Sequence, residues 1–181
     1  MARQSLGSDH HCGNLSGGNF SCLTGYCGTG KVECDWYSPT STTLVEFQLD
    51  GSQGMDFYVL SLVNGFNLPI LVVPEGDSRD NCTSVRCVAD LNERCPSELR
   101  VTTAGGERVA CKSACQAFGE NRYCCTGEYA GHDKCRPNQY TQVFEKACPE
   151  ASSSLHDRAA SLVSCAGADY TITFCPSSNA R

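Results

Sequence analysis

The densest hydrophobic patterning lies between residues 43 and 73. The segment TLVEFQLDG alternates apolar and polar residues and places Val45, Phe47 and Leu49 on one face, which predicts a half-buried β-strand. The apolar runs MDFYVLSLVNG and NLPILVV follow it and predict further strands. The Asp-Gly pair at 50–51 and the Asn-Gly pair at 64–65 are hairpin signals. We therefore expect the core of a β-sandwich in this segment.

Three other segments carry weaker patterns. The segment ADYTITF near the end of the chain alternates and predicts one more strand. The segment VACKSACQAFGEN spaces its apolar residues at helical intervals, which predicts a short helix over 109–118 that ends at Gly119. Residues 1–43 are rich in Gly, Ser, Thr and Cys and have no sustained period, so we expect short loops there.

Fifteen cysteines in 181 residues indicate disulfide bonds, because this density approaches that of disulfide scaffolds from oxidising compartments. Zinc is the alternative, and the segment CCTGEYAGHDKC, with His132, imitates a metal site. Structural zinc sites commonly use CxxC pairs, and the sequence contains none, so we favour disulfides. Sequons at Asn14, Asn19 and Asn81 also fit a secretory route, and their glycosylation stays open.

Charge and the first residues narrow the class of protein further. The net charge of −6 argues against nucleic acid or an anionic membrane as the main partner. No apolar run is long enough to span a membrane. The opening MARQSLGSDHHC lacks the apolar core of a signal peptide, so we expect either a processed or truncated piece of a longer secreted protein or a gene prediction that lacks its first exon.

The segment GGNFSCLTGYCGTGKVEC resembles the signature of the thaumatin-like, pathogenesis-related group 5 plant proteins. The matching positions are Cys22, Thr24, Gly25, Cys27 and Cys34, and Tyr26 stands where the family has Asp. The likeness continues through VRCVADLNERCP, CKSACQAF, CRPNQYTQVFEKACPEA and YTITFCP, so it extends from Cys12 to Pro176.

The resemblance implies a mainly β protein: a flattened antiparallel β-sandwich whose N-terminal strands are missing from this chain. The sandwich core would comprise 42–88 and 149–181, a small disulfide-stapled loop lobe 1–41, and a disulfide-rich lobe with a short helix 89–148. The family pattern also implies the pairs Cys12–Cys22, Cys27–Cys34, Cys82–Cys165, Cys87–Cys148, Cys95–Cys111, Cys115–Cys124 and Cys125–Cys135. It leaves Cys175 unpaired, so we expect a monomer, or a dimer joined through Cys175.

The resemblance also implies a function in plant defence, outside the cell in the apoplast or in the vacuole. It implies binding of β-1,3-glucan or a fungal cell-wall component in a cleft between the sandwich and the cysteine-rich lobe, with no cofactor. Two alternatives stay open: a weak endo-β-1,3-glucanase, and an inhibitor of a fungal or insect glycosidase.

The acidic residues that line the family's cleft are only partly present. Glu46 and Asp157 match two of them, whereas Val59 and Asn64 occupy two positions where the family has Asp. Glycoside hydrolysis needs two carboxylates, so a second acid would have to act with Glu46.

Asp56 is a candidate for that second acid. Glu46 and Asp56 are symmetric about Gly51, so a hairpin turning there would place them opposite each other, with Cβ atoms about 5 Å apart. The candidate catalytic set is therefore Glu46, Asp56 and Asp157. We favour the simpler alternative, in which Asp56 accepts hydrogen bonds from backbone amides near the turn.

Aromatic side chains could stack on sugar rings in such a cleft. The candidates are Trp36, Tyr37, Tyr58 and Phe66, of which Phe66 is better explained as a core residue.

Overall fold

A computed structural model describes residues 2–6, 12–14, 20–30, 41–75, 82–131, 133–155, 157 and 162–177. Its strands are β1 (Ala2–Leu6), β2 (Cys12–Asn14), β3 (Phe20–Cys22), β4 (Leu44–Gln48), β5 (Met55–Ser61), β6 (Ile70–Glu75), β7 (Val85–Cys87), β8 (Arg100–Thr102), β9 (Arg108–Cys111), β10 (Val163–Ala166) and β11 (Asp169–Phe174). Its helices are α1 (Leu91–Arg94), α2 (Ala114–Phe118), α3 (Asn121–Cys124) and α4 (Gln139–Ala147), with 3₁₀ turns η1 (Ser52–Gly54), η2 (Ser97–Leu99) and η3 (Gly127–Tyr129).

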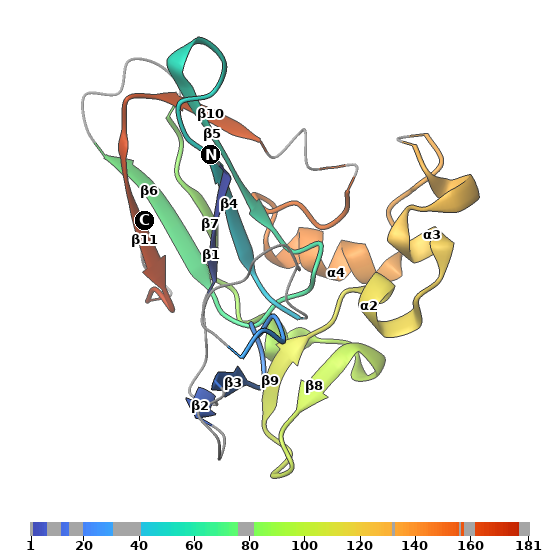
Figure 1. The fold of residues 1–181 in the computed structure, drawn as a ribbon. Helices are drawn as coiled ribbons and strands as arrows, with labels where there is room; N and C mark the ends of the chain where they lie inside the picture. Colours follow the sequence, from blue (N-terminus) through green and yellow to red (C-terminus); the bar gives the residue numbers. More distant parts are fainter. Residues whose placement is uncertain are drawn as a thin grey trace.

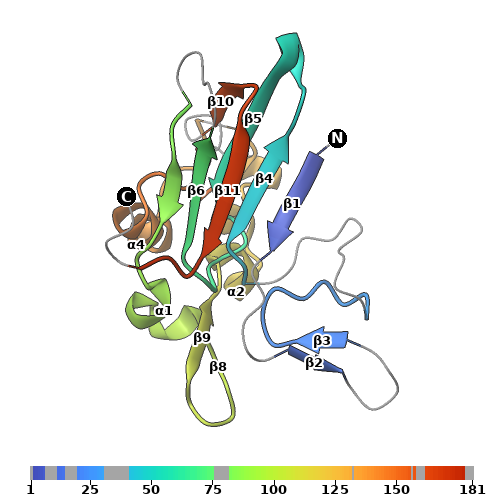
Figure 2. The same ribbon diagram turned by 90° about the vertical axis from the view of Figure 1, so that its left-hand side faces the viewer.

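Two antiparallel sheets form the predicted β-sandwich. One has the strand order β1-β4-β5-β10 and the other the order β11-β6-β7. Figure 2 shows β11 and β6 lying beside β4 and β5 with similar strand directions. In Figure 1 helices α2, α3 and α4 lie together on one side of this sandwich, beyond the four-stranded sheet. The predicted mainly β fold with a cysteine-rich lobe is confirmed.

The alternation in β4 sorts its side chains as the sequence predicts. Val45 and Phe47 are buried and Gln48 is exposed, but Leu49, predicted on the buried face, is 40% exposed because it lies beyond the end of β4. Burying an aliphatic or aromatic side chain of this size contributes about 1.5–3 kcal/mol, so the interior face holds the strand in its register.

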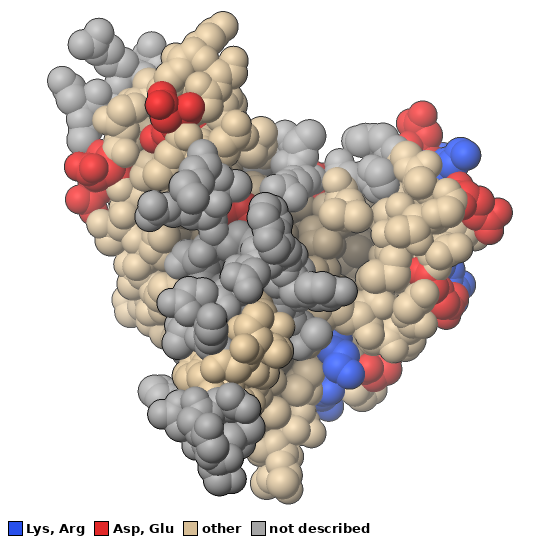
Figure 3. Space-filling view, in the orientation of Figure 1, with Lys and Arg blue, Asp and Glu red and all other residues tan. Residues whose placement is uncertain are grey.

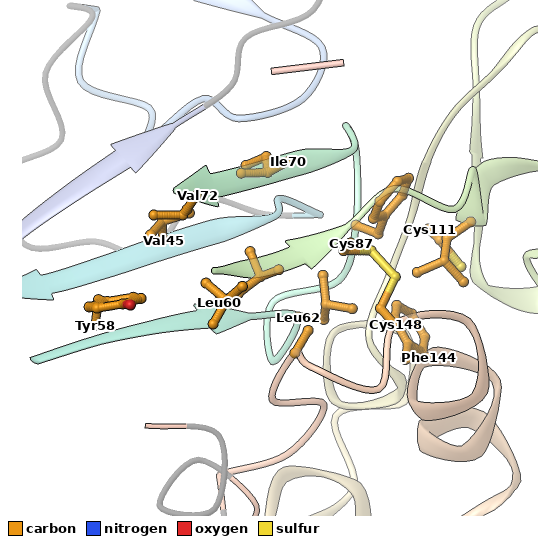
Figure 4. Close-up of a cluster of buried hydrophobic side chains, with 14 of the residues drawn as sticks. Val45, Tyr58, Leu60, Leu62, Ile70, Val72, Cys87, Cys111, Phe144 and Cys148 are labelled. Atoms are coloured by element: carbon orange, nitrogen blue, oxygen red, sulfur yellow. A yellow bond between two sulfur atoms is a disulfide. The ribbon is translucent and has the colours of Figure 1, made fainter. Parts of the chain in front are cut away.

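The core continues from the sandwich into the cysteine-rich lobe. Figure 4 shows Tyr58 and Leu60 of β5 near one end of the cluster and Phe144 of α4 near the other. The Cys87–Cys148 disulfide lies where the two parts meet and joins β7 to the end of α4. A shared core of this kind holds the lobe against the sandwich.

The Asp-Gly pair lies in the connection between β4 and β5, which pair antiparallel, so the hairpin predicted there is confirmed, whereas the hairpin predicted at the Asn-Gly pair is wrong. The Asn-Gly pair is a turn, but it leads from β5 in one sheet to β6 in the other, so it makes no hairpin. Gly65 has a φ of 91°, and a Cβ there would lie 2.3 Å from the carbonyl oxygen of Cys111. This close approach lets Phe66 and Cys111 exchange two backbone hydrogen bonds of 2.8 Å, which link the sandwich to β9.

Two expectations from the sequence are wrong. Residues 2–6 were expected to be loop in the small lobe, but they form β1, which pairs with the edge of β4. The helix expected over 109–118 begins only at Ala114, because residues 108–111 pair with β8 as strand β9. The end at Gly119 is confirmed, since Gly119 adopts the left-handed conformation and donates its amide to Cys115.

Helix α4, the longest helix among the described residues, was not predicted. Asn138 caps it, because its side chain accepts hydrogen bonds from the amides of Tyr140 and Thr141, and the Thr141 hydroxyl accepts a hydrogen bond from the Asn138 amide. This capping box, followed by buried Tyr140 and Phe144 four residues apart, was a readable helix signal.

The described residues contain six of the implied disulfides: Cys12–Cys22, Cys82–Cys165, Cys87–Cys148, Cys95–Cys111, Cys115–Cys124 and Cys125–Cys135. Cys27 is also disulfide-bonded, and its implied partner Cys34 lies outside the described residues. Cys175 carries a free thiol and is exposed.

Candidate functional site

A cleft of about 230 Å³ lies where the sandwich meets the cysteine-rich lobe. Figure 3 shows the molecular surface hollowed between these two parts. Its walls come from the turn after β5, the start of α2, α3, α4 and the segment after α4, with the side chains of Asn64, Gln116, Tyr123, Tyr140, Ser154 and Leu155 among those that line it. Among the residues that the structure describes, the side chains that line it include neither Lys nor Arg, nor Asp nor Glu.

Hydrogen bonds hold the start of α2 in place beside the cleft. Ser113 caps the helix, because its Oγ accepts a 3.2 Å hydrogen bond from the Gln116 amide. The side-chain oxygen of Gln116 then accepts a 3.0 Å hydrogen bond from the amide of Ser41. This contact joins the lobe to the chain entering β4, so the two walls of the cleft are tied together.

One wall of the cleft is aromatic. Tyr123 and Tyr140 line it, and their rings contact each other and the ring of Phe118, with centroid distances of 5.2 to 5.8 Å. The Tyr140 hydroxyl donates a 3.0 Å hydrogen bond to Glu98, which fixes that ring. Tyr123 is only half-buried, so its ring can meet a ligand.

Asp157 organises the opposite rim instead of facing the cleft as an acid. Its carboxylate accepts hydrogen bonds from the amides of Ser153 and Ser154, at 2.8 and 2.9 Å, and from the hydroxyl of Ser152 at 2.6 Å. The Ser153 hydroxyl also lies 3.0 Å from it. These donors hold the serine loop that forms this rim, so the visible role of Asp157 is to position the loop.

Glu46 lies on the outer face of the four-stranded sheet, directly opposite Val59 in the β4–β5 pairing. It lines a separate depression of about 430 Å³ together with Phe57 and the exposed side chain of Leu162. The residue that the family pattern would make its acidic neighbour is therefore a buried valine.

The predicted facing pair of Glu46 and Asp56 is wrong. Because Glu46 pairs with Val59, three positions beyond Asp56, the odd shift turns Asp56 to the opposite face of the sheet. The 3₁₀ turn η1 in the connection causes this shift, since it replaces the tight turn at Gly51.

Asp56 instead holds the turn and joins the two sheets. Its carboxylate is buried and accepts a 2.8 Å hydrogen bond from the Asp50 amide, as the simpler alternative anticipates. It also accepts a 3.0 Å hydrogen bond from the Tyr170 hydroxyl of β11. The Tyr170 ring packs against Phe47 and Tyr58, so this bond lies among aromatic rings between the sheets.

This environment predicts a loss of stability in alkali. Burial, followed by the hydrogen bond to Asp56, raises the pKa of Tyr170 well above its ordinary value, and burial also raises the pKa of Tyr58. The folded state then holds these protons more tightly than the unfolded chain, so the free energy of unfolding should fall as the pH rises above about 10. Urea titrations at a series of pH values should give a shallower fall for Tyr170→Phe. The control Tyr129→Phe should keep the wild-type slope, and an unchanged slope in Tyr170→Phe would contradict the argument.

The predicted sugar-stacking residues are not the ones that the structure offers. Tyr58 and Phe66 are fully buried in the core, which confirms the core reading of Phe66 and removes Tyr58 as a candidate. Trp36 and Tyr37 lie outside the described residues. The aromatic wall of the cleft escaped the sequence analysis, because its rings are distant along the chain and come together only through helix packing.

The described part of the chain contains no set of side chains that could bind the zinc ion considered in the sequence analysis. Cys124, Cys125 and Cys135 are all engaged in disulfides, and His132 lies outside the described residues. Among the residues that the structure describes, no group of three or more His, Cys, Asp and Glu side chains is placed to hold a metal ion. The helices described are also too short or too polar to cross a membrane.

Comparison with known proteins identifies the family. The model of the thaumatin family matches residues 6–176. Thaumatin-like protein 1 of Arabidopsis thaliana is 46% identical over 170 residues, covering 91% of this chain and 64% of the relative. The PR5-like receptor kinase of the same plant is also 46% identical, over 91% of this chain and 26% of its own length.

A third relative has a similar identity and coverage. The pathogenesis-related thaumatin-like protein 3.5 of Cryptomeria japonica is 45% identical, over 92% of this chain and 68% of its own. The chain thus spans about two thirds of the length of the thaumatin-like proteins it resembles and about a quarter of the receptor kinase. With the sandwich, the cysteine-rich lobe and the cleft between them, this match shows that the chain belongs to the thaumatin family.

Proposed function

We propose that the protein is a secreted plant defence protein that binds β-1,3-glucan of a fungal cell wall in the cleft and does not hydrolyse it. Family membership supports the defence role, since similar proteins carry pathogenesis-related names. The disulfides of the described residues support an oxidising, extracytoplasmic environment, where such bonds persist.

The observation that carries the proposal is the chemistry of the cleft lining. An aromatic wall that includes Tyr123 lies beside amide and hydroxyl side chains such as Asn64 and Ser154. Neutral sugars present apolar ring faces and hydroxyl edges, which rings and uncharged polar groups can match. Concave sites of this composition are typical of binding sites for small or chain-like ligands.

The positions of the acidic residues argue against hydrolysis. Cleavage of a glycosidic bond needs two carboxylates on either side of that bond, about 5 to 9.5 Å apart. Glu46 and Asp56 lie on opposite faces of the sheet, and Asp157 is hydrogen-bonded within the serine loop. None of these three carboxylates lines the cleft, so we propose a binding protein and not a glucanase.

Sedimentation with insoluble β-1,3-glucan, followed by a reducing-sugar assay, tests the proposal. We expect retention without sugar release. Tyr123→Ala should weaken retention about tenfold, because the ring-stacking contact is lost. Phe174→Ala removes an exposed ring from strand β11, outside the cleft, and should bind like the wild type.

Two results would overturn this function. Sugar release that disappears in Glu46→Ala would make the protein an enzyme that uses Glu46. Failure of the folded protein to sediment with the glucan would remove the proposed ligand.

A further inference from the structure

A second pocket lies on the outer surface of the cysteine-rich lobe. It has a volume of about 560 Å³ and is formed by α3, η3 and the segment that leads into α4. Its lining includes the cationic side chains of Arg122, Lys134 and Arg136 and the rings of Tyr123 and Tyr129. We infer that this pocket binds an acidic oligosaccharide of the uronic-acid class. The contacts would be made to the carboxylate that each sugar ring carries.

Two of the three cations are available to an incoming anion. Within the part of the chain that the structure describes, neither Lys134 nor Arg136 forms a salt bridge, and both are exposed. Arg122 is already engaged: it pairs with Glu120 at 2.7 Å, and its guanidinium lies 4.6 Å from the centre of the Tyr123 ring. Lys134 and Arg136 therefore supply the charge for a ligand, whereas Arg122 helps to hold the Tyr123 ring.

The distribution of charge along the chain makes this pocket distinctive. Residues 41–75, which contain three strands of the sandwich, include no Lys or Arg in a chain whose net charge is −6. On the face drawn in Figure 3, the Lys and Arg side chains among the described residues all lie over the lobe. A polyanion repelled by the sandwich would thus meet its cationic contacts on the lobe.

The rest of the lining selects a sugar over a simple anion. Tyr123 and Tyr129 add aromatic rings, of the kind on which pyranose rings stack, to the lining, and Asn138 and Gln139 add uncharged hydrogen-bonding groups. The pocket also lies at the start of α4, the positive end of the helix dipole. A chain of pyranose rings that carry carboxylates satisfies all of these groups together, whereas a phosphate or sulfate ion would leave the rings uncovered.

The pocket adjoins the cleft, because Tyr123 lines both. The inference nevertheless does not rest on the proposed function, since its ligand is anionic and its charged residues, Lys134 and Arg136, do not line the cleft. Loss of glucan binding would leave it intact, and loss of uronate binding would leave the glucan proposal intact.

Calorimetric titration with a defined oligogalacturonate tests the inference on the folded, oxidised chain. The double variant Lys134→Gln/Arg136→Gln should weaken binding about tenfold or more, because two charge-assisted hydrogen bonds are lost. The same variant should still sediment with neutral β-1,3-glucan. Binding to the wild type should weaken as salt is added, since the contacts are ionic.

A matched control removes two exposed cations elsewhere on the lobe. Arg94→Gln/Lys146→Gln changes the net charge equally and should change the affinity less than about twofold, because exposed charges distant from the ligand are screened. Equal losses in the two double variants would reduce the effect to diffuse attraction and overturn the site.

Two further ligands test whether the pocket recognises the carboxylates of the sugar or only negative charge. The fully methyl-esterified oligomer should bind at least about tenfold more weakly, because it lacks the carboxylates that Lys134 and Arg136 would meet. Dextran sulfate should not compete as well as the oligogalacturonate. Equal binding of the ester, or equal competition by dextran sulfate, would overturn a uronate-specific pocket.

Discussion

Replacing Cys87 and Cys148 together by alanine is expected to lower the free energy of unfolding by about 4 kcal/mol, the effect of opening a long loop in the chain-entropy treatment. The bond closes a sequence separation of 61 residues and joins β7 of the sandwich to the end of α4. Both sulfurs are buried in the shared core, so water would reach the contact between sandwich and lobe only after unfolding. Denaturant titration of the oxidised proteins measures the difference.

The Cys115–Cys124 bond provides the control. It spans only nine residues and lies within the lobe, between α2 and α3. Its removal as Cys115→Ala/Cys124→Ala should cost about 3 kcal/mol, because the entropy of loop closure rises with loop length. A loss in this local variant equal to or larger than that of Cys87→Ala/Cys148→Ala would show that loop length does not govern these bonds.

Gly65→Ala should lower the free energy of unfolding by about 3 kcal/mol or more, a large loss for the addition of one methyl group. Two effects combine at this position. The φ of 91° disfavours any residue with a Cβ, and that Cβ would lie 2.3 Å from the Cys111 carbonyl oxygen and 3.0 Å from the Ser113 nitrogen. Relief of the clash would separate Phe66 from Cys111 and break the two backbone bonds that tie sandwich to lobe. Thermal unfolding followed by circular dichroism would report the loss.

Gly119→Ala isolates the steric part of this prediction. Gly119 also has a positive φ, of 67°, but a Cβ there meets no atom within 4 Å. Its substitution should cost only about 1–2 kcal/mol, the penalty for a left-handed residue with a side chain. Similar losses in the two variants would mean that the backbone relaxes around Gly65 and that the contact with Cys111 is soft.

The candidate site contains features that could not be predicted from the sequence. The match of Glu46 to the family pattern was readable from the sequence, but its partner was not, because the partner depends on the register between β4 and β5. The register between β4 and β5 follows from η1, in which Gln53 adopts a left-handed conformation. The alternation of apolar and polar residues in the sequence does not indicate this conformation. An odd shift was enough to move Asp56 from the solvent face to the space between the sheets.

The disulfides behave differently from the acidic residues. Their pairing came from a family resemblance and needed no register, because each cysteine either matches the pattern or does not. The free thiol at Cys175 has the same origin, and the structure has it exposed at the end of β11.

From the sequence alone, four strands of the sandwich (β4, β5, β6 and β11), the buried Phe66, the end of α2 at Gly119 and the family could be predicted, since these depend on local alternation, size and spacing. Three features became known only from the tertiary structure. They are the relative positions of the carboxylates, the rings that form the wall of the cleft, and the cations of the lobe that line one pocket. The physical reason is that these contacts join residues far apart in the chain. Tyr123 and Tyr140 meet, and Asp56 meets Tyr170, only after the sheets and helices have packed.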